Sequence, residues 1–96
     1  MSPGALRCVR LRITGRVQGV WYRGWTVAQA RELGLDGWVR NRRDGSVEAV
    51  VSGASEQVDE LIARCRIGPP AAEVDHVHVT PEAEPVASGF HQKPTV

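Results

Sequence analysis

The first apolar segment of the chain alternates with polar residues and predicts a half-buried strand. Residues 8–14 read CVRLRIT, in which Val9, Leu11 and Ile13 form the apolar set. An alternation with a period of two places these side chains on one face of a sheet. The next segment, residues 15–21, reads GRVQGVW and contains two glycines, so we expect a loop there.

From Tyr22 onward the hydrophobic period becomes that of a helix. Tyr22, Thr26, Ala30 and Leu33 fall on one helical face. Gly34 is suited to the position just after the helix, because glycine adopts the left-handed conformation at little cost. We therefore expect a helix that begins at Tyr22 and ends before Gly34.

Two further strands are predicted to form a hairpin. Residues 35–41 read LDGWVRN and residues 46–52 read SVEAVVS, and both segments are rich in strand-forming residues. Asp44-Gly45 lies between them and is a common pair of turn residues. We expect an antiparallel pair joined by a loop of about four residues.

The second helix has the clearest apolar stripe. The stripe follows the i, i+3, i+4, i+7 spacing and consists of Val58, Leu61, Ile62 and Cys65. We expect Ser55 to cap the N-terminus of this helix, where Glu56 and Asp59 favour the positive end of the helix dipole. Residues 68–70, GPP, end the helix.

The remaining segments complete a β-α-β-β-α-β order. Residues 74–80, VDHVHVT, predict a fourth strand, and a short edge strand is expected around Phe90. This order defines an α+β fold of the ferredoxin-like, split βαβ type, with two helices on one face of an antiparallel sheet. We expect one domain over residues 1–96, with residues 1–6 as a flexible lead. Because this fold carries many functions, the function has to be argued from the site.

Composition excludes several classes of protein. The chain has 96 residues, a formal net charge of +1, 42% hydrophobic and 24% charged residues, as expected of a globular domain. Such a small net charge does not indicate a nucleic-acid or membrane partner. No apolar stretch is long enough to span a bilayer, and the N-terminus lacks the apolar core of a signal peptide, so we expect a cytoplasmic protein. Nothing demands more than a monomer.

The two cysteines are expected to be structural. Cys8 and Cys65 are far apart and form no CxxC motif, so neither a zinc site nor a disulfide framework is indicated. We expect two reduced, buried packing residues. His76 and His78 lack a third nearby ligand, and we expect a solvent-facing polar pair rather than a zinc site.

The loop before the first helix has the features of an anion-binding site. Backbone N–H groups at a helix start have no intrahelical partners, and the helix dipole makes that end positive. Glycines allow successive N–H groups of residues 16–22 to converge on one anion. Arg23 in the first turn can fork two oxygens of a phosphate. The sequence contains neither GxxxxGK[ST] nor GxGxxG, so by pattern alone a plain connecting loop remains the alternative.

Two long motifs resemble the signatures of the acylphosphatase family. GRVQGVWYR at residues 15–23 resembles the first signature, and GWVRNRRDGSVEAVVSG at residues 37–53 resembles the second. Their order and spacing also match, and the resemblance covers roughly residues 6–92. It implies an enzyme that hydrolyses the carboxyl–phosphate bond of acyl phosphates, without metal or cofactor and with inorganic phosphate as product and inhibitor. Acetyl phosphate, carbamoyl phosphate and 1,3-bisphosphoglycerate all contain this bond, and the sequence does not choose among them.

The resemblance also implies roles for individual residues. Arg23 matches the family's catalytic arginine, which binds the phosphoryl group, and Asn41 matches the asparagine that positions the attacking water. The backbone of the loop is expected to complete the phosphate site, through Arg16, Val17, Gln18, Gly19, Val20, Trp21 and Tyr22. Gly15 and Gly53 are expected to be structural.

The other arginines and the tryptophans are expected to be structural or solvated, and two other classes of function are possible. Arg40, Arg42 and Arg43 are expected to be solvated hairpin charges, and the tryptophans are expected in the core or at a pocket rim; these are Trp21, Trp25 and Trp38. An RNA-binding module of the RRM type needs aromatic residues in its third strand, and SVEAVVS has none. The second alternative is an acylphosphatase-like module of a larger assembly, which acts in protein–protein interaction or in the handling of carbamoyl phosphate.

Overall fold

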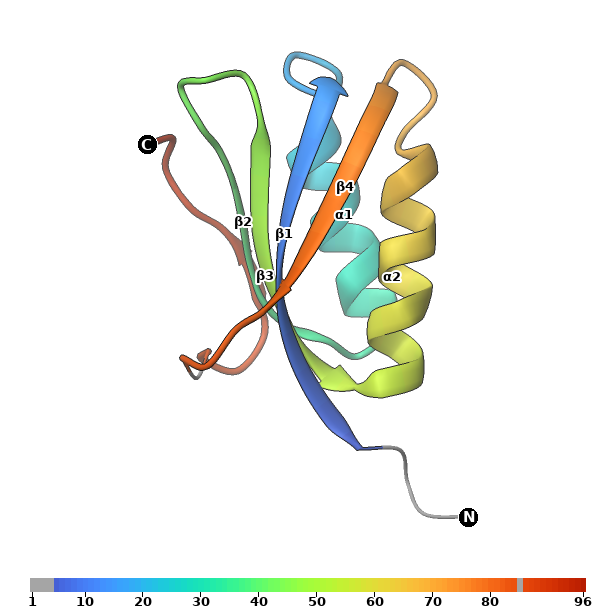
Figure 1. The fold of residues 1–96 in the computed structure, drawn as a ribbon, viewed down its shortest axis with the longest axis vertical. Coiled ribbons are helices and arrows are strands. Elements are labelled where there is room, and N and C mark those ends of the chain that lie inside the picture. Colours follow the sequence, from blue (N-terminus) through green and yellow to red (C-terminus); the bar gives the residue numbers. More distant parts are fainter. Residues whose placement is uncertain (1–4, 85) are drawn as a thin grey trace.

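The predicted order of elements is confirmed by a computed structural model that describes residues 5–84 and 86–96. The elements are β1 (Leu6–Arg16), α1 (Tyr22–Glu32), β2 (Asp36–Asn41), β3 (Val47–Ala54), α2 (Ser55–Ile67), β4 (Glu73–Pro81) and β5 (Phe90–Gln92). Figure 1 shows the loop between β1 and α1 at the same end of the sheet as the β2–β3 hairpin. The expected strand around Phe90 is β5.

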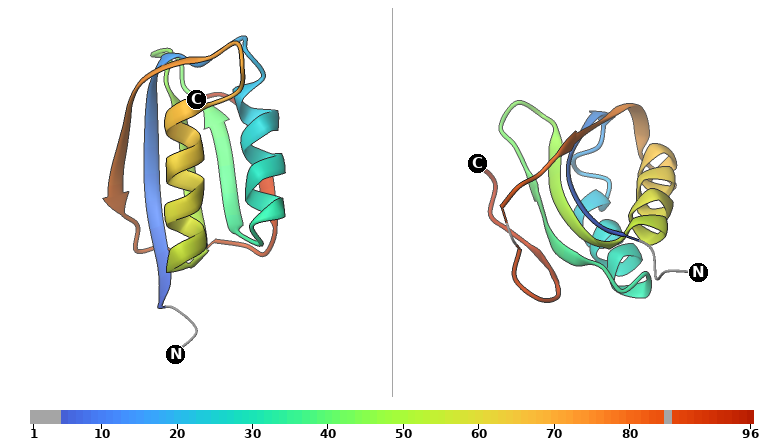
Figure 2. Two further views of the ribbon diagram at one scale, coloured as in Figure 1. Left: turned by 90° about the vertical axis from the view of Figure 1, so that its right-hand side faces the viewer. Right: turned by 60° about the horizontal axis from the view of Figure 1, so that its bottom comes forward.

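The five strands form one sheet in the order β4-β1-β3-β2-β5. Both helices lie on one face of this sheet, as predicted (Figure 2). The first four strands pair in antiparallel fashion, but β5 pairs with β2 in parallel, so the prediction of a wholly antiparallel sheet was wrong. The reason is topological: β4 ends at the end of the sheet where β2 begins, so the returning chain runs in the direction of β2.

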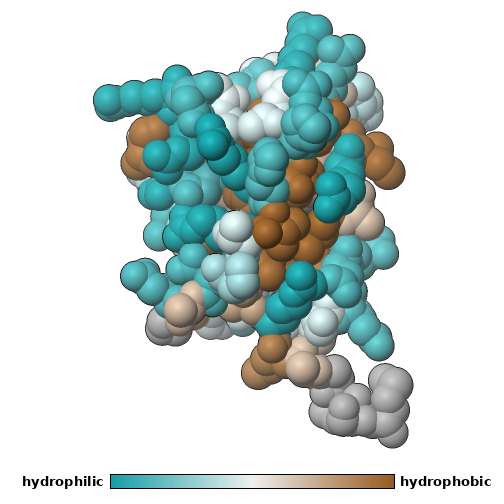
Figure 3. Space-filling model, in the orientation of Figure 1, coloured by the Kyte–Doolittle hydropathy of each residue, from teal (hydrophilic) through white to brown (hydrophobic). Residues whose placement is uncertain are grey.

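The core lies between the helices and the sheet, where the sequence pattern placed it. Val9, Leu11 and Ile13 of β1 are at most 3% exposed. The predicted stripe of α2 is buried against the sheet, from Val58 to Cys65. Figure 3 shows a largely hydrophilic face, with apolar side chains gathered between β4 and α2, where the core reaches the surface.

The first strand begins earlier and ends later than the sequence pattern predicts. Residues 1–4 of the expected lead lie outside the described residues, but Leu6 already pairs with Ala54 of β3. The strand continues through a register shift between Thr14 and Gly15, where Gly15 has a φ of 119°. A Cβ on Gly15 would overlap the Glu73 carbonyl, so this glycine is structural, as expected.

The start of α2 also differs from the prediction. Ser55 does not cap the helix, because it is the first helical residue, and the N-cap is Ala54 with an extended backbone. The chain passes directly from β3 into α2, and the Ser55 N–H donates instead to the carbonyl of Ala5. Within the described residues, no helix is both long and apolar enough to cross a lipid bilayer.

Candidate active site

A pocket of about 110 Å³ brings the two predicted site residues together. Arg23 reaches it from the first turn of α1, and Asn41 reaches it from the last position of β2. The lining residues are Val17, Gln18, Gly19, Trp21, Tyr22, Arg23, Gly24, Asn41 and Gln92. The pocket therefore joins the two sequence motifs at one end of the sheet.

Arg23 is a half-buried cation with no protein partner. Its guanidinium makes no ion pair and no hydrogen bond with any described residue, whereas many arginines of this chain are paired. The ion-paired arginines are Arg7, Arg10, Arg12, Arg40, Arg42 and Arg64. Arg23 thus keeps its donors available to a bound anion.

The loop that precedes Arg23 leaves its backbone donors free. In the described chain, no N–H from Val17 to Gly24 donates to a backbone or side-chain acceptor. The N-terminus of α1 has no side-chain cap and no acidic residue in its first turn. Gly19, with a φ of 73°, allows the loop to curl. Free donors and the helix dipole together make this end of α1 positive.

Two of the predicted loop residues lie apart from the pocket lining. Arg16 is the last residue of β1, opposite Glu73 of β4, rather than a loop residue. Val20 packs against the hydrophobic core. The loop therefore begins at Val17, and its other predicted residues, from Gln18 to Tyr22, all line the pocket except Val20.

Gln18 contributes a side-chain contact that sequence reasoning missed. Its side-chain amide donates to the carbonyl of Arg42 at 2.7 Å and to the carbonyl of Ser46 at 2.9 Å. Both acceptors belong to the β2–β3 hairpin that carries Asn41. The first motif predicts a role for the backbone of Gln18, and no spacing in the sequence signals this long-range side-chain contact.

Asn41 offers an unused acceptor at the pocket. Its Oδ1 is buried and has no hydrogen-bond partner in the described part of the chain. Its backbone carbonyl accepts the N–H of Val96 at 3.2 Å. A buried amide oxygen without a partner is costly, and it is expected to bind water or substrate. Gln92 of β5 lines the same pocket and was also missed by sequence reasoning.

Tyr22 lines the pocket but is not available as an acid. Its hydroxyl donates to the carbonyl of Cys65 at 2.6 Å, which ties α1 to α2. Burial raises the pKa of the Tyr22 hydroxyl far above its ordinary value. Burial likewise raises the pKa of the Cys65 thiol to about 12, so this cysteine is a packing residue, as expected. Cys8 is only half-buried, so the prediction that both cysteines are buried was wrong for Cys8.

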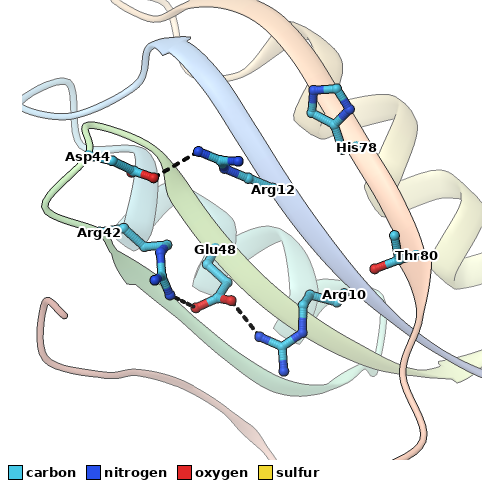
Figure 4. Close-up of a pocket in the computed structure, with 7 residues that line it drawn as sticks. All are labelled: Arg10, Arg12, Arg42, Asp44, Glu48, His78 and Thr80. Atoms are coloured by element: carbon cyan, nitrogen blue, oxygen red, sulfur yellow. Dashed lines mark hydrogen bonds and ion pairs between the residues drawn. The ribbon is translucent and has the colours of Figure 1, made fainter.

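A larger hollow of about 490 Å³ lies on the sheet face opposite the helices (Figure 4). Its centre is Glu48, which accepts hydrogen bonds from Arg10 at 2.5 Å, Arg40 at 2.7 Å and Arg42 at 3.1 Å. Burial acts to raise the pKa of Glu48, but these arginines hold that pKa below its ordinary value. The charges of this hollow are satisfied internally, so it lacks the free donors of the smaller pocket.

This network corrects the expectation for the hairpin arginines. Arg40 and Arg42 are not free solvated charges, because both pair with Glu48. Trp38 lies among cations on the same open face, with Arg40 and Lys93 each 4.6 Å from its ring centre, and so is neither core nor rim of the smaller pocket. Trp21 is at that rim, and Trp25 packs against the core.

The histidine pair carries no metal site in the described part of the chain. His76 and His78 are both exposed on β4, with ring centres 5.6 Å apart, as expected of a solvent-facing pair. No group of three or more His, Cys, Asp or Glu residues among those described is placed to hold a metal ion.

Fold and site together define a class: a ferredoxin-like α+β domain with a cationic pocket at one end of its sheet. The acylphosphatase family model matches residues 9–92. The chain is 62% identical to an acylphosphatase of Rhizorhabdus wittichii, over 91% of this chain and 88% of that relative. It is 54% identical to an acylphosphatase of Rhodospirillum rubrum, over 95% of this chain and all of that relative.

A solved structure agrees with these relatives. The acylphosphatase from Coxiella burnetii superposes with a TM-score of 0.89 at 32% identity, over 97% of this chain and all of that one. The chain belongs to the acylphosphatase family. It is an enzyme that hydrolyses acyl phosphates.

Proposed function

We propose that the pocket binds the phosphoryl group of the acyl phosphate through Arg23 and the backbone N–H groups of the loop from Val17 to Tyr22. The observation that carries this proposal is the convergence of free donors: an unpaired guanidinium and a run of unbonded N–H groups line one small pocket. A phosphoryl group in transfer carries its charge on peripheral oxygens, and preorganised donors around them lower the barrier.

Asn41 positions the attacking water. The buried and unpartnered Oδ1 of Asn41 supports this role, because it can accept a hydrogen bond from a water O–H beside the phosphorus. An amide has no basic site at neutral pH, so Asn41 orients the water without taking its proton. The proton passes to the phosphoryl oxygens or to solvent.

The chemistry of the leaving group makes a general acid unnecessary. Hydrolysis breaks the bond between phosphorus and the carboxylate oxygen, and a carboxylic acid has a pKa of about 4. The carboxylate therefore departs without being protonated. Tyr22 is engaged with Cys65 and is not needed as a proton donor. Positioning and charge stabilisation account for the reaction.

Further properties belong to the same proposal. The enzyme acts without a metal ion, inorganic phosphate competes with substrate for Arg23 and the loop, and the protein works as a cytoplasmic monomer without nucleic acid or membrane. Light scattering of the purified protein tests the monomer, and a dimeric mass at micromolar concentration contradicts it.

Benzoyl phosphate hydrolysis in the presence of EDTA tests the proposed roles. Wild-type enzyme is expected to be active and competitively inhibited by phosphate. Arg23→Ala and Asn41→Ala are each expected to lose about a hundredfold or more in kcat/KM while remaining folded by circular dichroism. Loss of wild-type activity in EDTA contradicts metal independence, and a wild-type rate in either variant contradicts the role of that residue.

A further inference from the structure

Trp21 is an exposed indole at the rim of the pocket, in an unfavourable backbone conformation. Its side chain lines the pocket beside Arg23, yet the residue is 68% exposed. Its φ of 65° and ψ of 26° are left-handed, and Trp21 is the one non-glycine residue of the described chain with a positive φ. Left-handed backbone is costly for a bulky side chain, and such strain concentrates at functional positions.

Gly24 provides the seat for this indole. A Cβ on Gly24 would overlap Nε1 of Trp21 and lie 2.9 Å from both Cδ1 and Cε2. The Nε1 edge of the indole therefore lies against Gly24. A glycine in the first turn of α1 weakens the helix, but here the missing Cβ leaves room for the Nε1 edge of the indole. The indole is in contact with Gly24 on one side, and the residue remains largely exposed.

A purely structural role does not account for these features. A side chain that is 68% exposed buries little apolar area and contributes little to the core. Its Nε1–H donates to no acceptor in the described part of the chain. The left-handed backbone, the exposure of the indole and the glycine in the helix are each unfavourable, and together they accompany an exposed indole beside Arg23.

The size of the pocket determines what part of the substrate reaches this surface. About 110 Å³ is well below the roughly 300–1,000 Å³ of pockets that enclose a whole small molecule. With the phosphoryl group at Arg23, the acyl group has to extend past the rim. Trp21 is the large exposed hydrophobic residue on that rim.

We propose that Trp21 is a specificity-determining residue, whose indole binds the acyl group and favours acyl phosphates with aromatic or extended apolar acyl groups over acetyl phosphate. This inference rests on the proposed binding of the phosphoryl group by Arg23. A planar acyl group stacks on the indole face with the offset geometry that aromatic pairs prefer, and an acetyl group offers little area for that contact.

The ratio of kcat/KM for benzoyl phosphate to kcat/KM for acetyl phosphate tests the proposal. This ratio is independent of the fraction of folded enzyme. Trp21→Gly relieves the left-handed strain and keeps the backbone N–H, and its ratio is expected to fall about fivefold to tenfold, the size of an aromatic contact. Gly24→Ala displaces the indole and lowers the ratio in the same direction, whereas Trp21→Phe keeps a flat ring and stays within about twofold of wild type.

Trp38→Ala is the matched control, because Trp38 lies on the opposite sheet face, and its ratio is expected to equal that of wild type. An unchanged ratio in Trp21→Gly, with Arg23→Ala inactive, overturns the role of Trp21 alone. Full activity in Arg23→Ala instead overturns the phosphoryl site on which the inference rests.

Discussion

The side chain of Gln18 holds the backbone of Arg42. Its amide donates to the Arg42 carbonyl at 2.7 Å and to the Ser46 carbonyl at 2.9 Å, across the gap between the loop and the β2–β3 hairpin. Arg42 directly follows Asn41. One side chain therefore sets the position of the loop relative to the residue that we propose orients the water.

Replacing Gln18 by Ala is expected to lower both stability and turnover. Loss of two hydrogen bonds costs about 1–3 kcal/mol of unfolding free energy. A shift of the hairpin by about 1 Å is expected to lower kcat for benzoyl phosphate on the order of tenfold to a hundredfold. The inhibition constant for phosphate is expected to change less, because Arg23 still binds the phosphate. Gln57→Ala, on the exposed face of α2, is the control. A wild-type kcat in Gln18→Ala refutes the positioning role.

The residues after β5 hold the backbone of Asn41 through hydrogen bonds. Val96 donates its N–H to the carbonyl of Asn41 at 3.2 Å, and its own carbonyl accepts the N–H of Arg43 at 2.7 Å. Deletion of residues 94–96 removes both bonds, so we expect a loss of about 1–3 kcal/mol in urea unfolding and a lower kcat. Thr95→Ala keeps the backbone bonds and serves as control. Full stability and turnover after the deletion rule out this support.

Glu48 is expected to make stability depend on acid pH. Its pKa is lowered in the folded state, so its stabilising contribution is present above the unfolded value of about 4.3 and is lost as pH falls through the folded pKa. Glu48→Gln leaves partly exposed arginines around a neutral group, and we expect a loss of about 1–3 kcal/mol at pH 7. The difference from wild type shrinks below about pH 4.

Glu60→Gln is the control for Glu48→Gln. Glu60 forms a solvent-exposed pair with Arg64 one helical turn away, and such exposed pairs contribute little to stability. Thermal unfolding from pH 3 to pH 7 measures both variants. A difference between Glu48→Gln and wild type that is the same at every pH contradicts the ionic role of Glu48.

Much of the fold could be predicted because local pattern and tertiary burial agree. The alternation around Leu11 and the stripe from Val58 to Cys65 each mark a face that the structure buries. The direction of β5 could not be predicted, because it depends on which sheet edge the chain reaches after β4. The cap at Ser55 was mispredicted because β3 runs into α2 without a loop.

Part of the candidate site could likewise be predicted from the sequence, and part could not. Arg23 and Asn41 lie in motifs, and the structure places both at one pocket. The contacts of Gln18 and the arginine cluster around Glu48 link segments far apart in the sequence, and polar residues in a strand or loop do not reveal such partners. The seat of Trp21 on Gly24 depends on a single left-handed residue, which no hydrophobic period encodes.

In the proposed mechanism, the guanidinium of Arg23 holds the phosphoryl group in the transition state. The most direct measurement compares kcat/KM for benzoyl phosphate in Arg23→Ala and in Arg66→Ala, which removes an exposed arginine near the end of α2. We predict a loss of about a hundredfold or more in Arg23→Ala and wild-type activity in Arg66→Ala, with both variants folded. Equal activity in the two variants would rule out this role of Arg23.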